Sequence, residues 1–350
     1  MDLPILYRSK APFRLGIAGG GTDVSPYSDL YGGAVLNVTI DRFAYATIRP
    51  TDDGKIRFIH INDHIVQEFD CVPYLEPQGP LMLQCGIYNR IVRQFNDGVP
   101  FSFELTTKMD VPSGSGLGTS STLVVAILGA FVEGRNLPLG KYDIARLAYE
   151  IERIDLGMAG GKQDQDAATF GGVNFMEFLS GDRVIVNPLS IPDRTLNEWA
   201  FNTVLLYTNK RRESARIIEE QMANVQQKNS GSVEAMHRVK EEAFRIKRCL
   251  LQNNLHELGP ALNTSWVNKK KMAGGISNAT VMAAPAEAPV QPEPAPAAEI
   301  TPEAENIQAP EKSGFLKSQP VSGGKAPAWA LPAIAFVFLA LGVMTGLLLF

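Results

Sequence analysis

The sequence predicts an α+β fold in two domains, followed by a disordered linker and one transmembrane helix. Early segments are rich in β-branched and aromatic residues, and later segments repeat apolar residues at helical spacing. Proline, alanine and glutamate dominate after residue 278, and the last stretch is apolar and uncharged. With 350 residues, the chain is long enough for two domains with hydrophobic cores.

Three early segments are predicted strands, because their apolar residues alternate or are β-branched and aromatic: 44–49, 56–61 and 101–106. Three later segments show the spacing of amphipathic helices: 142–154, 214–227 and 233–251. Because the strands lead and the helices follow, the pattern favours α+β over a regular βαβ repeat.

A loop rich in glycine and hydroxyl residues, 111–122, runs into a buried helix predicted for 123–131. Gly114, Gly116 and Gly118 allow positive φ and close backbone approach to a ligand. The helix adds free N–H groups and the positive end of its dipole. Together they indicate an anion site, most simply for nucleotide phosphates, with a flexible Ser/Gly turn as the alternative. The loop matches neither a P-loop nor the dinucleotide-binding fingerprint.

The run Pro112-x-Gly114-x-Gly116-Leu117-Gly118-Thr119-Ser120 resembles the phosphate-binding motif of the GHMP kinases. Residues 11–23 resemble the first motif of that family, in the Gly-Gly-Gly-Thr-Asp form of its sugar kinases. With 31–37 and 40–41, the chain is most similar to D-glycero-D-manno-heptose 7-phosphate kinases over about residues 8–278. The resemblance implies that these loop residues bind the ATP phosphates: Pro112, Ser113, Gly114, Ser115, Gly116, Leu117, Gly118, Thr119, Ser120 and Ser121.

The resemblance also implies the domain organisation. Residues 1–190 correspond to a ribosomal-S5-like N-terminal domain that binds ATP, and 191–278 to a ferredoxin-like C-terminal domain, with the active site between them. The family has a third glycine-rich motif near its C-terminus, which this sequence does not show after residue 278. We therefore expect a truncated second domain.

Phosphoryl transfer needs held phosphates, Mg²⁺, an aligned hydroxyl and a group that takes its proton. By resemblance, Asp164, which follows Gly160-Gly161, is the catalytic aspartate, and Asp166 is a structural acid behind it. Arg14 matches the cation of the first motif, and a guanidinium stabilises negative charge near the reacting oxygen well.

The resemblance implies a Mg²⁺ site made by Ser120 and Glu152, with Glu150 competing for the role of the carboxylate. The sugar hydroxyls would be held by these residues of the first motif: Gly20, Gly21, Thr22 and Asp23. A turn-initiating role is the alternative for Asp23. A phosphate already on the substrate would need another cationic patch, for which 210–212 and 269–271 are candidates, although charge runs are usually solvated.

Composition excludes some classes of function. The 33 basic and 37 acidic residues nearly balance, so nothing indicates binding to nucleic acid. Cys71, Cys85 and Cys249 form no CxxC pair and are odd in number, which fits a reducing compartment. We expect no zinc site at His60 and His64, because the surrounding residues alternate like a strand.

The end of the chain predicts a membrane anchor. Proline-rich residues 279–327 cannot form a packed core and should be a disordered acidic linker. The predicted tail helix, 328–350, carries no charged side chain, and its residues 329–350 would form a helix roughly 33 Å long, enough to cross a bilayer. The lysines before this segment favour a cytoplasmic kinase tethered to the cytoplasmic membrane by its C-terminal helix, with a buried core helix as the alternative.

These observations predict a kinase that uses ATP and Mg²⁺ to phosphorylate the anomeric hydroxyl of a heptose 7-phosphate, in heptose biosynthesis. Its partners would be the sugar phosphate, ATP and the membrane. One alternative is another sugar-1-kinase, such as a fucokinase-like enzyme. Another is a catalytically impaired, membrane-tethered protein that only binds ligand. The oligomeric state is left open.

Overall fold

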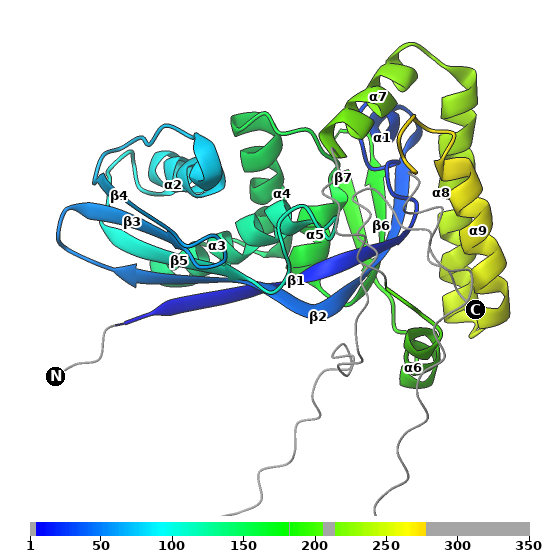
Figure 1. Cartoon of the computed structure of the whole chain (residues 1–350), viewed down its shortest axis with the longest axis horizontal. Helices are drawn as coiled ribbons and strands as arrows, with labels where there is room; N and C mark the ends of the chain where they lie inside the picture. The colour runs from blue at the N-terminus through cyan, green and yellow to red at the C-terminus, as the bar shows by residue number, and fades with distance from the viewer. Residues whose placement is uncertain (1–4, 182, 206–213, 278–350) are drawn as a thin grey trace, which may run out of the picture.

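The computed structural model describes residues 5–181, 183–205 and 214–277. Within them the strands form one seven-stranded sheet in the order β4-β3-β5-β2-β6-β7, with β1 paired to β2. Helices cover one face of this sheet, and a second group of helices lies at one end of it (Figure 1). The predicted linker and tail, 279–327 and 328–350, lie outside the described residues.

Strand β2 (Gly33–Pro50) organises the sheet because its 18 residues reach two neighbours on one edge. Its first part pairs with β6 (Val173–Leu179) and its last part with β5 (Phe103–Met109). Strand β1 (Tyr7–Ala18) pairs along the other edge. The predicted strand 44–49 is confirmed as part of β2.

The remaining strands extend the two ends of the sheet: β3 (Lys55–His60), β4 (Ile65–Asp70) and β7 (Arg183–Pro188). All pairings in the described sheet are antiparallel except that of β3 with β5. Strand β3 confirms the prediction for 56–61. The predicted strand 101–106 begins two residues late and continues to Met109, because β5 pairs with β2 over that range.

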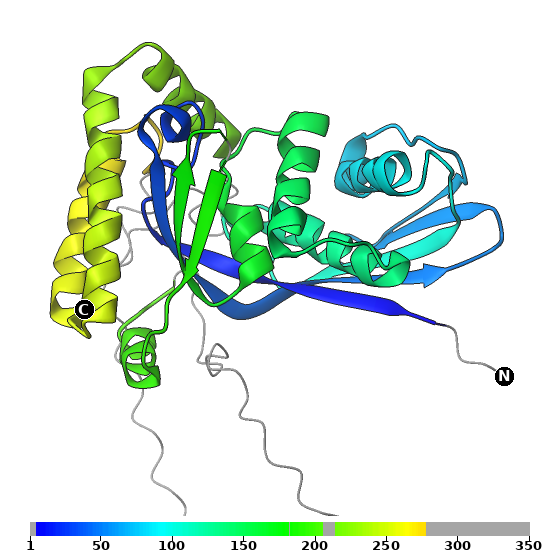
Figure 2. The same ribbon diagram turned by 180° about the vertical axis from the view of Figure 1, so that it is seen from behind.

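Four helices lie over one face of the sheet (Figures 1 and 2): α2 (Met82–Phe95), α3 (Thr119–Arg135), α4 (Lys141–Tyr149) and α5 (Gln163–Phe170). Helix α3 is apolar around most of its circumference, because it packs against β1 and β2 on one side and other helices elsewhere. The buried helix predicted for 123–131 is therefore confirmed. A short helix α1 (Tyr27–Tyr31) follows the N-terminal glycine-rich motif.

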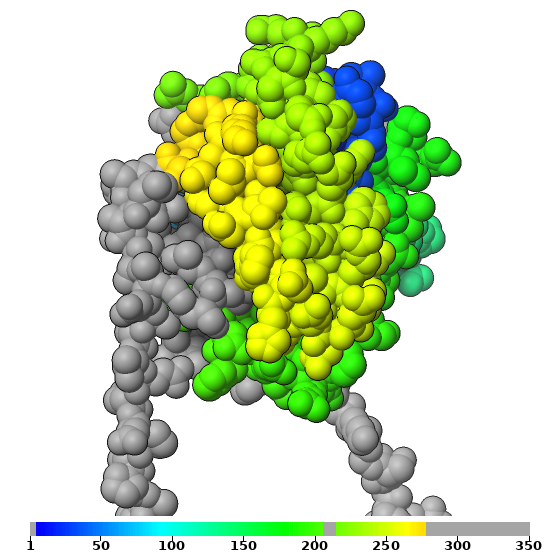
Figure 3. Space-filling model, turned by 90° about the vertical axis from the view of Figure 1, so that its right-hand side faces the viewer, coloured from blue at the N-terminus to red at the C-terminus, as the bar shows by residue number. Residues whose placement is uncertain are grey.

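The later helices are α6 (Asp193–Phe201), α7 (Ser214–Gln226), α8 (Ser230–Leu251) and α9 (Leu258–Lys269). Helices α8 and α9 pack side by side and form the face shown in Figure 3. Both predicted helices in this region are confirmed. Helix α8 begins three residues before the expected start because the Asn229 side chain caps it, accepting a hydrogen bond from the Ser232 N–H at 3.2 Å. Short 3₁₀ turns precede α2 (Gly79–Leu81) and α9 (Leu255–Glu257).

Two expectations were wrong in part. Strands do not all precede helices, since β6 and β7 follow α5 and complete the sheet. The predicted helix 142–154 is α4 continued by a π turn, η2 (Glu150–Asp155). In the part of the chain that the structure describes, no helix is both long and apolar enough to span a membrane.

Candidate active site

The glycine-rich loop leads into the N-terminus of α3, as predicted. Gly114, Gly116 and Gly118 have φ values of +76°, +81° and +73°, so all three occupy the left-handed region that favours glycine. Gly118 is the residue before the first turn of α3. The loop therefore curls at the positive end of a 17-residue helix, where an anion is favoured.

Arg14 and Asp164, which are 150 positions apart, form an ion pair beside this loop. Arg14 extends from β1 and donates from Nε and Nη2 to Asp164 Oδ1, at 2.7 and 2.5 Å. Its Nη1 donates to the Gly116 carbonyl oxygen at 2.9 Å. Because Arg14 is buried, it fixes the carboxylate and the loop relative to each other.

The aspartate also touches the loop itself. A Cβ atom on Gly118 would lie 3.2 Å from Asp164 Cγ and 3.3 Å from its Oδ2. Asp164 is in the first turn of α5, whose N-terminus therefore faces that of α3. The two helix ends bring the predicted phosphate loop and the predicted catalytic carboxylate into contact.

Glu152 lies on the other side of the loop and is fully buried. One oxygen accepts a hydrogen bond from the Ser120 hydroxyl, and the other accepts one from Gln165 Nε2 at 2.6 Å. Glu150 instead pairs with Arg90 and Arg146. Of the two glutamates, Glu152 is thus the one that faces the phosphate loop.

The pair of Ser120 and Glu152 fits Mg²⁺. A hydroxyl and one carboxylate converge, and a hard cation there would complete its shell with ATP oxygens and water. Among the described residues, no cluster of three or more His, Cys, Asp or Glu side chains could hold a metal alone. This arrangement suits a metal that arrives with the nucleotide.

The N-terminal glycine-rich motif is packed into the protein. Thr22 is buried, and its hydroxyl lies 2.7 Å from the Gly19 carbonyl oxygen and 3.1 Å from that of Ala34. Asp23 is 1% exposed and accepts four hydrogen bonds, from the Gly21 N–H, the Lys162 N–H, and both the N–H and Nε2 of Gln163.

Asp23 therefore caps the N-terminus of α5 from a distant part of the chain. A negative charge is favoured there, and the cap fixes the turn that carries Asp164. Sequence reasoning missed this role, because neither residue type nor spacing signals a cap 140 positions away. That Thr22 and Asp23 hold sugar hydroxyls stays a prediction.

The Gly160-Gly161 pair lies directly against two charged side chains. A Cβ atom on Gly160 would lie 2.3 Å from Arg153 Cζ, and one on Gly161 would lie 1.9 Å from Asp23 Oδ2. The glycines make room for protein side chains, and this room lets Asp23 reach α5.

Asp166 lies behind the site and is almost fully buried. Burial raises the pKa of its carboxyl to about 7, the charge of Asp23 adds to this effect, and Lys162 opposes it. Its burial suits the structural function expected of it, whereas Asp164 is the acid that pairs with Arg14 beside the phosphate loop.

Two segments from the C-terminal helices approach the sugar motif. Lys269 on α9 is buried, and its Nζ donates to the Gly20 carbonyl oxygen. Gln221 on α7 is 1% exposed, and neither atom of its amide has a hydrogen-bond partner. A Cβ atom on Gly21 would meet both side chains at 3.0 Å. The other candidate patch, 210–212, lies outside the described residues.

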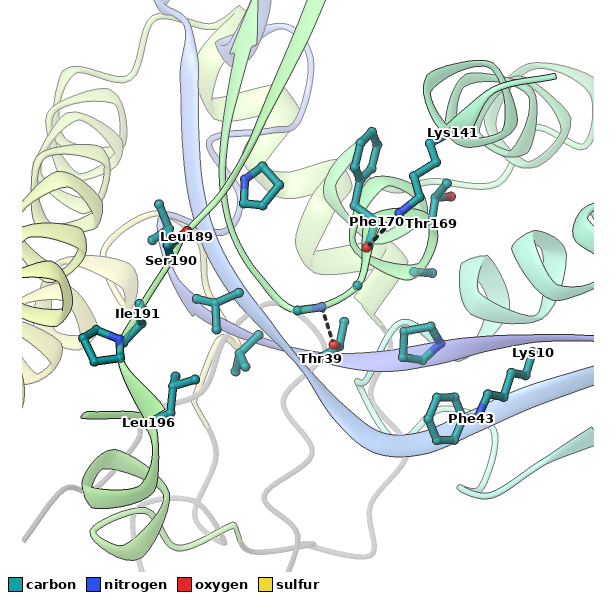
Figure 4. Close-up of a pocket in the computed structure, with 18 residues that line it drawn as sticks. Lys10, Thr39, Phe43, Lys141, Thr169, Phe170, Leu189, Ser190, Ile191 and Leu196 are labelled. Carbon is teal, nitrogen blue, oxygen red and sulfur yellow. Dashed lines mark hydrogen bonds between the residues drawn. The ribbon is translucent and has the colours of Figure 1, made fainter. Parts of the chain in front are cut away.

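A separate cavity of about 760 Å³ opens at the far end of α5 (Figure 4). Its walls are mainly apolar, and Lys10 and Lys141 stand among the lining residues. Lys141 Nζ donates to the Phe170 carbonyl oxygen at 3.4 Å, and the Gly172 N–H donates to Thr39 Oγ1 at 2.7 Å. None of the predicted site residues lines this cavity, so it is distinct from the candidate active site.

Known proteins with similar sequences are sugar kinases. The family model described as the GHMP kinases N terminal domain matches residues 83–172. A D-glycero-alpha-D-manno-heptose 7-phosphate kinase from Campylobacter jejuni is 48% identical over 271 residues, which are 77% of this chain and 79% of the relative. An L-fucokinase/L-fucose-1-P guanylyltransferase from Bacteroides fragilis is 26% identical, and the match covers 78% of this chain and 31% of that protein.

Solved structures agree with the sequence matches. A D-glycero-D-manno-heptose 1-phosphate kinase from Bacteroides thetaiotaomicron has a TM-score of 0.67 and 48% identity, over 76% of this chain and 80% of that one. A putative sugar kinase from Campylobacter jejuni has a TM-score of 0.63 and 46% identity, over 77% of each chain. A mevalonate kinase, at 17% identity, shares the fold with a TM-score of 0.61 over 79% of this chain and 82% of that one.

Proposed function

Because this chain belongs to the GHMP kinases, as a sugar kinase that uses ATP and Mg²⁺, we propose that it phosphorylates the anomeric hydroxyl of a heptose 7-phosphate. The contact of Arg14, Asp164 and the phosphate loop carries the proposal, since it joins a carboxylate, a cation and an anion site. The choice of a heptose is supported by the 48% identity to a heptose 7-phosphate kinase.

In this mechanism the loop 112–121 holds the phosphates of ATP at the N-terminus of α3. Arg14 occupies Oδ1 of Asp164, and Oδ2 lies beside Gly118 at the loop. Oδ2 would accept the proton of the attacking hydroxyl, while Arg14 stabilises negative charge close to the reacting oxygen. Mg²⁺, held by Ser120 and Glu152, would neutralise charge on the phosphates.

The sugar would lie between the first motif and the C-terminal helices. Gln221 brings an unpartnered buried amide to Gly21, and Lys269 brings a buried amine to Gly20. A buried amide without partners is costly unless a ligand satisfies it, and sugar hydroxyls both donate and accept hydrogen bonds. The patch 210–212 remains our sequence-based candidate for the substrate's own phosphate.

A panel of substrates tests the proposal. The purified protein is incubated with ATP, Mg²⁺ and either D-glycero-D-manno-heptose 7-phosphate, the unphosphorylated heptose, L-fucose, galactose or mevalonate. Formation of a sugar 1-phosphate is followed by ³¹P NMR. We expect turnover of the heptose 7-phosphate alone or far above the rest. Turnover only of an unphosphorylated sugar would contradict the heptose 7-phosphate assignment and favour the fucokinase-like alternative.

A further inference from the structure

The carboxylate assigned to Mg²⁺ lies on a π turn. Glu152 is the third residue of η2, which continues α4 and in which the Leu156 N–H donates to the Ile151 carbonyl oxygen at 3.0 Å, five residues back. Turns of this kind are rare; they appear mostly as single turns inside α-helices and are frequent at functional sites. Here the neighbouring helix α2 packs against the turn.

Arg90, on the neighbouring helix α2, pairs with both ends of this turn. Its Nη1 donates to Glu150 Oε2 at 2.7 Å. Its Nε and Nη2 approach Asp155 Oδ2 at 2.7 and 2.6 Å. Arg90 is itself 8% exposed, so the two ion pairs are shielded from water on its side.

The spacing of the two partners fits a π turn and not an α-helix. Residues five apart point about 140° away from each other in an α-helix, so one guanidinium could not reach both. In a π turn, hydrogen bonds join residues five apart, which places Glu150 and Asp155 on the same side. Glu152, two positions after Glu150, then faces the opposite way, toward Ser120.

Helix α2 is built to come this close. A Cβ atom on Gly86, one turn before Arg90, would lie 2.9 Å from both Cδ atoms of Leu156. A larger residue would separate the helix from the end of the turn. Arg146 also donates to Glu150 Oε1 at 3.0 Å, so both oxygens of this carboxylate have an arginine partner.

We propose that Arg90 is a positioning residue for the Mg²⁺ site: by pairing with Glu150 and Asp155, it holds the π turn that directs Glu152 at Ser120. The inference rests on the proposed function, in which Glu152 and Ser120 hold Mg²⁺. It assigns a positioning role to a residue whose hydrogen bonds go to Glu150, Asp155 and Gln94, away from the phosphate loop.

The test measures binding and avoids turnover. The affinity for the non-hydrolysable analogue AMP-PNP is determined by calorimetry with and without Mg²⁺, and the gain due to Mg²⁺ reports on the metal site. Arg90→Lys keeps the charge but cannot make the forked contact with both carboxylates. In this variant, we expect the increase in AMP-PNP affinity due to Mg²⁺ to be smaller by a factor of about ten or more. This is the usual scale for residues that orient metal ligands. The affinity for AMP-PNP without Mg²⁺ should stay unchanged.

Arg93→Lys is the matched control. Arg93 lies on the same helix and approaches the same Asp155, at 3.4 Å, but its side chain is 68% exposed, and the arginine of this helix that pairs with Glu150 is Arg90. The control should keep the full gain. If Arg90→Lys also keeps it and only lowers the melting temperature, Arg90 is a structural residue and the proposal is overturned.

Two further comparisons separate the possible failures. Should Arg90→Lys not fold, Glu150→Gln and Asp155→Asn each remove one of the two pairs, and both are expected to lose part of the gain. Retention of the gain by both overturns the proposal. Glu152→Gln tests the metal site itself. Loss of the gain in Glu152→Gln but not in the Arg90 variant refutes only this inference, whereas retention in Glu152→Gln refutes the metal assignment as well.

Discussion

At the scale of single residues, the site depends on how the two oxygens of Asp164 are used. Arg14 donates two hydrogen bonds to Oδ1, and Oδ2 lies beside Gly118. The cation therefore orients the carboxylate without occupying the oxygen nearest the phosphate loop. A nearby acid, Asp166, is instead almost fully buried.

Asp164→Asn should bind ATP normally, because the phosphate loop is a separate element. Its turnover should fall by about 10²–10⁴, the scale expected when a general base is removed. ATP affinity is measured by calorimetry and kcat by a coupled assay, with Asp166→Asn as the control that should lose far less activity. Near-normal turnover in Asp164→Asn together with an inactive Asp166→Asn would reverse the assignment.

Asp166 should make stability depend on pH. Its pKa is raised to about 7 in the fold, so between its ordinary pKa and 7 the folded state binds more protons than the unfolded state. Its contribution is therefore most favourable at low pH and becomes unfavourable as pH rises toward 7. Asp166→Asn should raise the melting temperature, and the gain should grow from pH 5 to pH 8. A gain that does not change with pH would show that the carboxyl is not perturbed in this way.

At the scale of elements, two helix N-termini meet at the candidate active site. The N-terminus of α3 carries the phosphate loop, and that of α5 carries Asp164. Asp23 caps α5 from the N-terminal motif, while Arg14 ties α5 to the loop. The candidate site thus lies between these elements. A displacement of one helix N-terminus should therefore displace the other.

Gly118→Val should weaken ATP binding itself, in contrast to Asp164→Asn. The new side chain would require a strained positive φ and would press on Asp164, which lies 3.2 Å from the Cβ position. Gly98→Val is the matched control, because Gly98 has φ +75° but no neighbour within 4 Å of its Cβ position. Both variants should lose stability in thermal melts, and only Gly118→Val should lose affinity for AMP-PNP. If the two variants bind AMP-PNP with equal affinity, Gly118 is not part of the nucleotide site.

At the scale of the whole molecule, the C-terminal helices reach back to the N-terminal motif. Lys240 Nζ donates to the Tyr31 carbonyl oxygen at 2.8 Å, and the ring of His237 pairs with the Tyr27 hydroxyl at 2.8 Å. With Lys269 at Gly20, these contacts hold α8 and α9 against the segment assigned to the sugar. The described part of the C-terminal region therefore packs against the N-terminal motif.

A fragment of residues 1–278 should turn over substrate at a rate similar to the full chain, because every side chain placed in the site lies between residues 14 and 269. The full chain should sediment with membranes, as the apolar segment 328–350 predicts, and the fragment should stay in the supernatant. Kinetics and fractionation are measured on the same preparations. Inactivity of both forms would favour the alternative of a protein that only binds ligand.

Local features could be predicted from the sequence because short-range chemistry decides them. The three glycines of the loop adopt the expected positive φ, and the apolar run after them forms the expected buried helix. The family and the sugar-kinase class followed from two motifs whose residue types match at fixed spacing. These properties depend only on residues that are close together in the sequence.

The tertiary structure alone decided which charged groups meet. It placed Glu152, and not Glu150, beside the phosphate loop, because Glu150 pairs with Arg90 on helix α2 while Glu152 accepts from Ser120, and the sequence does not reveal these partners. It made Asp23 the cap of α5, and Gly160-Gly161 the space for Arg153 and Asp23. The sequence by itself determined the family and the phosphate loop. The partners of each charge came from packing between distant segments, since burial and hydrogen bonding depend on where the whole chain places them.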